Sequence, residues 1–263
     1  MPVRLTSIVF EATDVAALAE FWCDQFEDWR IRPADGDEVR VVASEEDGAT
    51  VDLTFAKAPP RAKTGKNRIH LDLNSWGMHD YQTRHDVLPL GGATPVDIGQ
   101  GELVPWTVFA DPGGNEFCLL KPRERYAGTG ALAAVVVDSV DPPALAEFWS
   151  GATGWPVVES EADFAAVRAP GPPWRGPFLE FSRVPGRNPE PGPIVFGFES
   201  YWAHQHDADV ARLLELGAQQ VRKHDGDPAY TLLADPEGNE LRVVVPVWPP
   251  GPAGPRRTPP GRD

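Results

Sequence analysis

The sequence predicts an α+β protein built from two copies of one domain. The hexamer Ala-Leu-Ala-Glu-Phe-Trp occurs twice, at 17–22 and 144–149, and an Asp-Pro-x-Gly-Asn turn follows each, at 111–115 and 235–239. Short segments rich in β-forming residues surround both hexamers and are separated by acidic or glycine-containing turns. Because solenoid repeats are only roughly 20–50 residues long, a repeat of this length indicates a duplicated domain.

The two copies define the expected domain boundaries. We expect a first domain at 1–125, a linker at 126–130 and a second domain at 131–246. The remaining segment, 247–263, is so rich in proline and glycine that no packed fold is expected there. Each domain of about 125 residues is long enough to bury its own core.

In the first copy, the element order is β-α-β-β-β, twice over. Segment 5–12 is rich in β-formers, and Asp14 can cap the following helix, in which Val15, Leu18 and Trp22 have helical spacing. Acidic turns separate three short strands, and a basic loop at 58–66 leads to a fifth strand. Glycines end the second helix. The strands are expected at 5–12, 29–32, 38–43, 50–55, 67–74, 94–98, 106–110 and 116–120, and the second helix at 78–88.

The second copy repeats this order with one strand fewer. Its helices are expected at 143–149, which contains the repeated hexamer, and at 207–216, an amphipathic segment that Gly217 ends. Its strands are expected at 132–137, 156–159, 165–168, 178–181, 194–198, 230–233 and 241–245.

Composition limits the classes of partner. The formal net charge of -15 argues against binding to nucleic acid or to an anionic membrane, since both require a basic surface. The two cysteines, Cys23 and Cys118, form no disulfide framework and no metal-binding pair, which is typical of a cytoplasmic protein. No apolar run is long enough to span a bilayer.

Together, the paired β-α-β-β-β order, the Glu-Phe-Trp helix and the Asp-Pro-x-Gly-Asn turn resemble the vicinal oxygen chelate superfamily, which includes glyoxalase-like and bleomycin-resistance-like proteins. The resemblance implies two tandem glyoxalase-like domains, with paired modules that curl an eight-stranded mixed sheet into a cup and helices outside it. The superfamily includes isomerases, dioxygenases, thiol transferases and drug-binding proteins, so the fold alone does not name a function.

The resemblance also implies a place for a metal. Enzymatic members hold a divalent ion with side chains from the first, fourth, fifth and eighth strands of the cup. The corresponding residues are Ser7, Thr54, His70 and Cys118 in the first copy and Ala134, Glu180, Val195 and Arg242 in the second. Since a stable site needs about three or four protein ligands, we expect no metal cofactor. The alternative is a divalent metal at His70, and ligands pooled across the copies are a further possibility.

His70 is the strongest candidate for a catalytic residue. Strand alternation places His70 and Asp72 on one face and Ile69, Leu71 and Leu73 on the other. We expect Asp52, Thr54, Ser7, Glu11 and Cys118 to line the same cup by the same alternation. His70 would then act as acid or base with Asp72 or Asp52 orienting it. The alternative for His70 is a hydrogen-bonded structural histidine without catalytic function. Cys118 is either a nucleophile or a small apolar side chain that packs within its strand.

The remaining candidate residues are expected to bind a ligand and not to take part in a reaction. Glu180 and Arg242 are expected to pair across the second cup. Trp76, Trp106, Trp174 and Trp202 lie near loops or strand edges, where they either stack on a planar ligand or pack at the rim. Trp22 and Trp149 are repeat-equivalent, and we assign them to the core. The expected ligand-binding residues are Glu11, Thr54, Trp76, Trp106, Cys118, Glu180, Trp202 and Arg242.

Two functions follow from these patterns. The first is metal-independent binding of an aromatic or apolar metabolite, including an antibiotic held by sequestration. The second is an isomerase, lyase or cyclase of secondary metabolism that uses His70 as acid or base, with a metal-dependent version as a third. The expected partner is a small molecule, and the duplicated chain acts either as a monomeric pseudo-dimer or as a homodimer.

Overall fold

The computed structural model describes most of the chain. The described residues are 3–33, 37–43, 51–99, 101, 103–170, 176–226 and 228–246. The proline-rich segment 247–263 and Trp174 lie outside the described residues.

The helices and strands follow the repeated order. The first copy contains β1 (Arg4–Ala12), α1 (Val15–Cys23), β2 (Arg30–Pro33), β3 (Glu38–Val42), β4 (Asp52–Lys57), β5 (Ile69–Leu73), α2 (Met78–Val87), β6 (Thr94–Pro95), β7 (Trp106–Ala110) and β8 (Glu116–Leu120). The second contains β9 (Leu132–Ser139), α3 (Pro142–Thr153), β10 (Val157–Glu161), β11 (Phe164–Arg168), β12 (Phe178–Arg183), β13 (Ile194–Glu199), α4 (His206–Glu215), β14 (Gln219–His224), β15 (Tyr230–Ala234) and β16 (Glu240–Val244). Short 3-10 turns occupy Leu88–Gly91, Glu124–Tyr126 and Ala203–Gln205.

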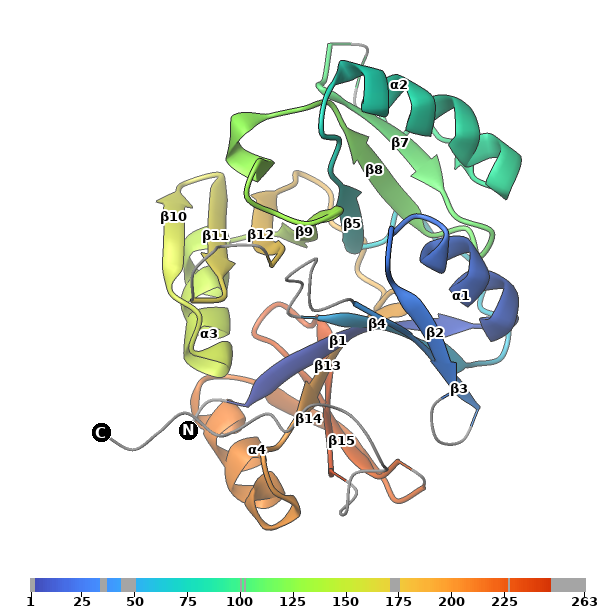
Figure 1. Cartoon of the computed structure of the whole chain (residues 1–263). Coiled ribbons are helices and arrows are strands. Elements are labelled where there is room, and N and C mark those ends of the chain that lie inside the picture. Colours follow the sequence, from blue (N-terminus) through green and yellow to red (C-terminus); the bar gives the residue numbers. More distant parts are fainter. Residues whose placement is uncertain are drawn as a thin grey trace.

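The strands form two eight-stranded mixed sheets, which confirms the predicted fold class (Figure 1). In sheet A the order is β14-β15-β16-β13-β1-β4-β3-β2, and in sheet B it is β10-β11-β12-β9-β5-β8-β7-β6. Each sheet therefore takes four strands from each copy. The seams are antiparallel, between β1 and β13 in sheet A and between β5 and β9 in sheet B.

This exchange follows from where the chain crosses between sheets. After β4 the segment 58–68 leaves sheet A and enters sheet B, and after β12 the segment 184–193 returns from sheet B to sheet A. The domain expected at 1–125 thus contributes half of each cup, and so does the one expected at 131–246. Any site inside a cup combines residues from both copies.

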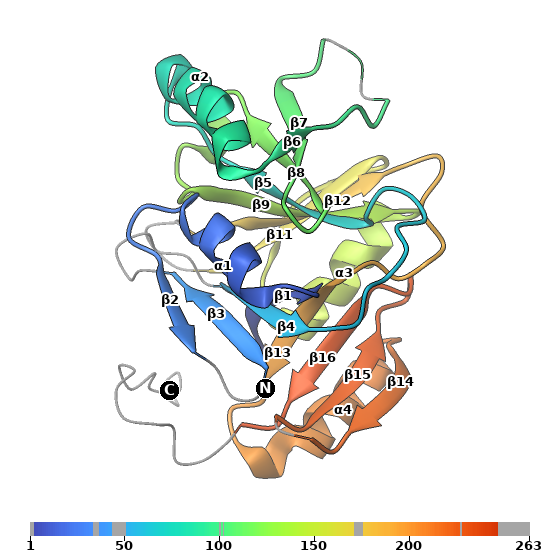
Figure 2. The same cartoon turned by 90° about the vertical axis from the view of Figure 1, so that its right-hand side faces the viewer.

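The helices lie on the faces of the sheets opposite the two cups. Helix α1 packs on β2, β3 and β4, α3 on β10, β11 and β12, α2 on β8, and α4 on β16. Figure 2 shows α1 and α3 between the two sheets, whereas α2 and α4 lie toward opposite ends of the molecule. One continuous apolar core joins both sheets through these helices, because side chains such as Trp22, Phe117, Trp149 and Phe196 belong to it together.

In each copy, the repeated helix forms a hydrogen bond with the repeated turn. The indole Nε1 of Trp22 donates to Asp111 Oδ2 at 3.0 Å, and that of Trp149 donates to Asp235 Oδ2 at 3.1 Å. Both rings are buried, as expected for core residues. Asp14 caps α1 as predicted, since its carboxylate accepts from the Ala17 amide at 3.1 Å.

The sequence prediction missed one strand. β14 at Gln219–His224 is an edge strand whose six residues are all exposed, so it carries no alternation of apolar and polar residues. The strand expected at 94–98 is shorter than predicted, since β6 covers only Thr94–Pro95.

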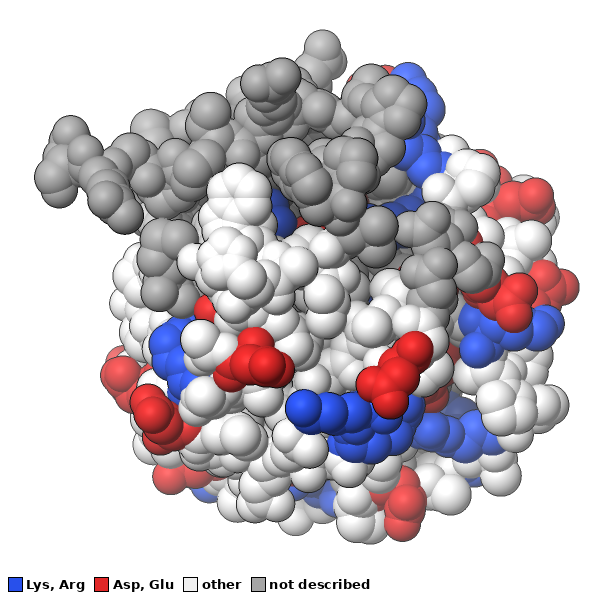
Figure 3. Space-filling view, turned by 90° about the horizontal axis from the view of Figure 1, so that it is seen from below, with Lys and Arg blue, Asp and Glu red and all other residues white. Residues whose placement is uncertain are grey.

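Charged side chains of both signs are interspersed across the face seen from below (Figure 3). Within the described part of the chain, none of the helices combines the length and the apolar character that crossing a bilayer requires.

Candidate functional site

The concave face of sheet B carries five of the predicted site residues, namely His70, Asp72, Cys118, Glu180 and Trp106. Residues directly opposite each other in neighbouring strands point to the same face of a sheet. The register therefore places a largely apolar set around His70 and Asp72: Phe164, Ala166, Phe178, Glu180, Ala134, Val136, Cys118, Leu120, Trp106 and Val108. The neighbours of His70 on β5, namely Ile69, Leu71 and Leu73, belong to the main core on the other face, as alternation predicted.

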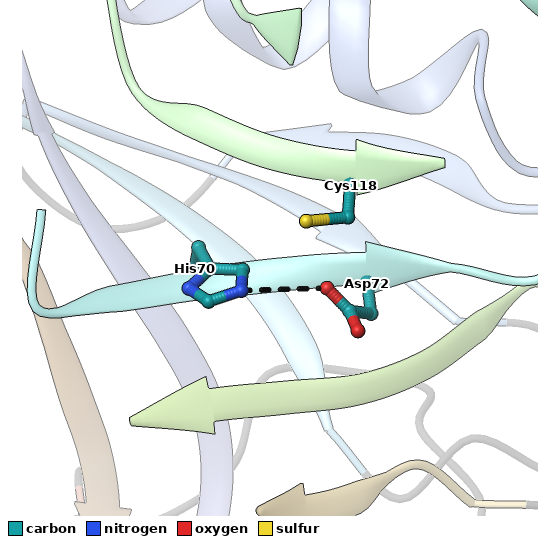
Figure 4. Close-up of side chains that lie close together, drawn as sticks. All are labelled: His70, Asp72 and Cys118. Carbon is teal, nitrogen blue, oxygen red and sulfur yellow. Dashed lines mark ion pairs between the residues drawn. The ribbon is translucent and has the colours of Figure 1, made fainter. Parts of the chain in front are cut away.

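His70, Asp72 and Cys118 form a compact polar cluster on this face (Figure 4). His70 Nε2 lies 3.5 Å from Asp72 Oδ1, and Cys118 lies directly opposite Asp72 on β8 and hydrogen-bonds its carboxyl. The side chain of His70 keeps 12% of its surface exposed. Its Nδ1 atom is buried and has no hydrogen-bond partner among the described residues.

Burial sets the charges of the cluster. It holds the pKa of His70 well below its ordinary value, with a smaller contribution from Lys66, so the imidazole is neutral at pH 7. Burial, assisted by the Glu180 carboxylate, raises the pKa of Asp72 to about 7. It also raises the pKa of the Cys118 thiol well above its usual range, with Asp72 adding to the shift. A protonated thiol is a weak nucleophile, which argues against the nucleophilic role considered for Cys118.

Glu180 is held by residues that the sequence reasoning missed. The Arg125 guanidinium donates to Glu180 Oε1 from Nη2 at 3.0 Å and from Nε at 3.2 Å, and the Tyr126 hydroxyl lies 3.2 Å from both carboxylate oxygens. Arg125 also pairs with Glu159. Tyr126 begins the segment expected to be linker, and Arg125 ends the expected first domain. The aromatic Tyr126 was the available signal, since a flexible linker has no need of an aromatic ring, and the structure buries it.

The cluster can be tested for its fit to a divalent metal. One donor atom from each of His70, Asp72 and Cys118 lies within 4.8 Å of the other two. His70 Nε2 faces Asp72 (Figure 4), and among the described residues Asp72 Oδ1 has no hydrogen-bond partner, which adds to the fit. Nitrogen, oxygen and thiolate donors suit an ion of the zinc class. Binding would have to displace the protons of Cys118 and Asp72, so the affinity would fall as the pH is lowered.

The concave face of sheet A carries four further predicted site residues together with Ser7. Ser7, Glu11, Asp52, Thr54 and Arg242 lie on it by register. Arg242 Nη1 lies 2.5 Å from Glu38 Oε1 and Nη2 lies 3.1 Å from Oε2, although three strands separate β16 from β3. The sheet is therefore curled enough for the two tips to meet. Glu11 pairs with Arg61 at 3.1 Å.

The prediction that Glu180 and Arg242 pair with each other is wrong. Both belong to the second copy, but Glu180 lies on β12 in sheet B and Arg242 on β16 in sheet A. The expectation that Asp52, Thr54, Ser7 and Glu11 share a cup with His70 fails for the same reason. Asp52 accepts from the Ala43 amide at 3.1 Å in sheet A and is not placed to orient His70.

The candidate tryptophans separate by exposure. Trp106 is half-buried at the edge of the sheet B cup, beneath Arg123, whose guanidinium lies 5.9 Å from the indole ring. Trp76 and Trp202 are 60% and 40% exposed, and they follow β5 and β13 outside the two concave faces. Of the three candidate tryptophans that the structure describes, Trp106 alone lies beside the polar cluster.

Comparisons with known proteins agree with this architecture. The sequence signature of the glyoxalase-like domain matches residues 7–120 and 134–244. Glyoxalase I from Zea mays has a similar fold, with a TM-score of 0.61 at 16% identity over 92% of both chains. A putative dioxygenase from Bacillus subtilis has a TM-score of 0.57 at 12% identity, over 93% of this chain and 86% of that one. Among proteins with curated descriptions, none matches the sequence.

Proposed function

The chain belongs to the glyoxalase-like domain family, and we propose that it binds a small, largely apolar organic molecule in the cup of sheet B, above His70. The observation that carries this proposal is a polar cluster in which His70 Nδ1 has no hydrogen-bond partner among the described residues, set in a wall of apolar and aromatic side chains beside the Glu180–Arg125 pair. Small-molecule sites typically combine such a wall with a few polar groups that fix the orientation of the ligand.

The edge of the cup supports this reading. Trp106, Phe164, Val96 and Ile98 pack on the buried apolar cluster of the cup but remain partly exposed. These side chains offer an apolar rim on which a planar ring can stack. The polar floor offers the His70 side chain, which keeps 12% of its surface exposed. Its Nδ1 can act as an acceptor or donor, depending on the tautomer, for one hydroxyl or amide group of a ligand that displaces the side chains burying it. Binding by these contacts requires no metal.

We expect planar aromatic ligands to quench tryptophan fluorescence saturably, and the Trp106→Ala variant to bind them roughly tenfold more weakly, since it loses a stacking contact. His70→Ala should weaken binding by up to about tenfold through the lost hydrogen bond. Isothermal calorimetry measures both. Trp76→Ala is the matched control, because Trp76 is exposed outside the cup. Equal losses in the Trp106 and Trp76 variants would place the ligand elsewhere.

A second candidate function is proton transfer by the same cluster. A neutral imidazole beside a carboxyl whose pKa is about 7 is suited to acid–base catalysis at neutral pH. His70 would take a proton from a substrate carbon or hydroxyl group at Nδ1, while Asp72 at Nε2 stabilises the imidazolium that forms. This arrangement supports an isomerase, lyase or cyclase, with Asp72 rather than Asp52 as the orienting group.

A metal at the cluster would be held by His70, Asp72 and Cys118, and it would supply a Lewis acid for a substrate oxygen. The proposed binding does not depend on it. Dialysis of the protein against EDTA is therefore expected to leave the fluorescence quenching curve unchanged, and elemental analysis of the untreated protein serves as the control. Binding that disappears with EDTA and returns with added Zn²⁺ would instead favour the metal-dependent function.

A further inference from the structure

The closing turns of the two copies differ at their third position, where the second copy has Glu237 and the first has Gly113. The Glu237 carboxylate is fully engaged by the chain just before α3. It accepts from the Asp141 amide at 2.8 Å, from the Val140 amide at 2.9 Å and from the Ser139 hydroxyl at 2.8 Å. The second copy thus contains a carboxylate-binding site that its own side chain fills.

The first copy reproduces the backbone of this site. The equivalents of Ser139, Val140 and Asp141 are Ala12, Thr13 and Asp14. Asp14 and Asp141 both cap the following helix through a side-chain bond to an amide three residues on. Lys57 donates to the carbonyl of Thr13, just as Arg183 donates to that of Val140. The two strand-to-helix junctions are therefore built alike.

The carboxylate itself is missing from the first copy. Gly113 has no side chain, and the amides of Thr13 and Asp14 donate no hydrogen bond within the described part of the chain. A cavity of about 670 Å³ lies at this position. Its lining includes Thr13, Asp14 and Gly113.

The cavity indicates the class of molecule that fits. Its size lies in the range of small-molecule sites, roughly 300–1,000 Å³. Much of its wall is apolar, with Leu18, Ala58, Pro59 and Pro112 among the lining residues. Charges of both signs line it: Lys63, which pairs with Glu116 at 2.8 Å, Arg61, which pairs with Glu11 at 3.1 Å, and the Asp14 carboxylate.

From these observations we propose that the first copy binds a small organic acid in this cavity, with the carboxylate of the acid on the Thr13 and Asp14 amides. The acid takes the place that Glu237 occupies in the second copy, and its apolar body lies against the prolines. Paired backbone amides ahead of a helix favour an anion through hydrogen bonds and through the helix dipole. This site is separate from the cup of sheet B and does not depend on the function proposed there.

The test uses 3-phenylpropionate as the probe and its neutral amide as a control, with amide NMR spectra of the full chain. Saturable shifts of the Thr13 and Asp14 resonances are expected with the acid and not with the amide. Gly113→Glu should weaken the binding of the acid at least about tenfold, because an attached carboxylate competes at a high effective concentration. Gly113→Ala is the matched control for crowding, since a Cβ here would lie 3.1 Å from Asn115 Nδ2.

The reverse substitution, in the second copy, gives an independent experiment. Glu237→Gly should open the site of the second copy, so that the acid also shifts the Val140 and Asp141 resonances. This experiment remains informative if Gly113→Glu does not fold. The proposal is overturned if the shifts of the first copy do not saturate, if the neutral amide binds equally well, or if the Gly113→Glu protein binds the acid as the wild type does.

Discussion

Replacing Asp72 by asparagine is expected to stabilise the protein progressively as the pH rises. In the folded chain, burial and Glu180 raise the pKa of Asp72 from 3.8 to about 7. Between these two values the folded state keeps a proton that the unfolded state has released, so the wild type loses about 1.4 kcal/mol of stability per pH unit. The free energy of unfolding of Asp72→Asn relative to wild type should therefore increase by about 4 kcal/mol between pH 4 and pH 8.

Urea unfolding at several pH values measures this difference. Asp163→Asn is the matched control, because the Asp163 side chain is 82% exposed and pairs with Arg183 on the surface. Its effect should stay within about 0.5 kcal/mol at every pH. His70 is present in both the wild type and Asp72→Asn, and its lowered pKa destabilises both proteins in acid. This contribution therefore cancels in the difference between their free energies of unfolding. A difference that does not change with pH would mean that Asp72 is ionised in the folded protein, and the acid–base candidate would lose its basis.

The fold was predictable because local signals repeat. Each copy carries a helix with the same apolar stripe and an Asp-Pro-x-Gly-Asn turn, and these features depend on residues close together in the chain. The strand pairing between copies was not predictable in the same way. Alternation states which face of a strand is buried, and it does not state which other strand lies beside it. Nothing in β5 itself distinguishes β9 from β4 as its neighbour.

The site prediction succeeded within a single strand and failed where it depended on which strands are neighbours. His70 and Asp72 are two residues apart on one strand, so alternation alone places them together. The proposed pairing of Glu180 with Arg242 required both strands to share a sheet, and they do not. Arg125 was beyond reach, because its contact with Glu180 depends on how the junction between the copies folds back over the cup.

A large loss of stability is expected when Trp149 is replaced by alanine. The Trp149 ring is fully buried, lies against Phe196 at 4.3 Å between centroids and donates to Asp235. The substitution leaves a cavity in the core that joins the two sheets, which typically costs about 3–5 kcal/mol.

Trp149→Ala also removes a donor from Asp235, a buried carboxylate whose pKa burial already raises. Its remaining donors are the Glu237 and Asn239 amides and the Asn239 side chain, so part of its charge is no longer compensated. Urea unfolding followed by circular dichroism measures the loss, and Trp76→Ala, at an exposed position, should change stability by less than about 0.5 kcal/mol. Because the Trp–Asp bond ties the repeated helix to the repeated turn, Trp22→Ala should cost a similar amount through Asp111. A loss below about 1 kcal/mol in both variants would mean that the repeated motifs are not what stabilises the core.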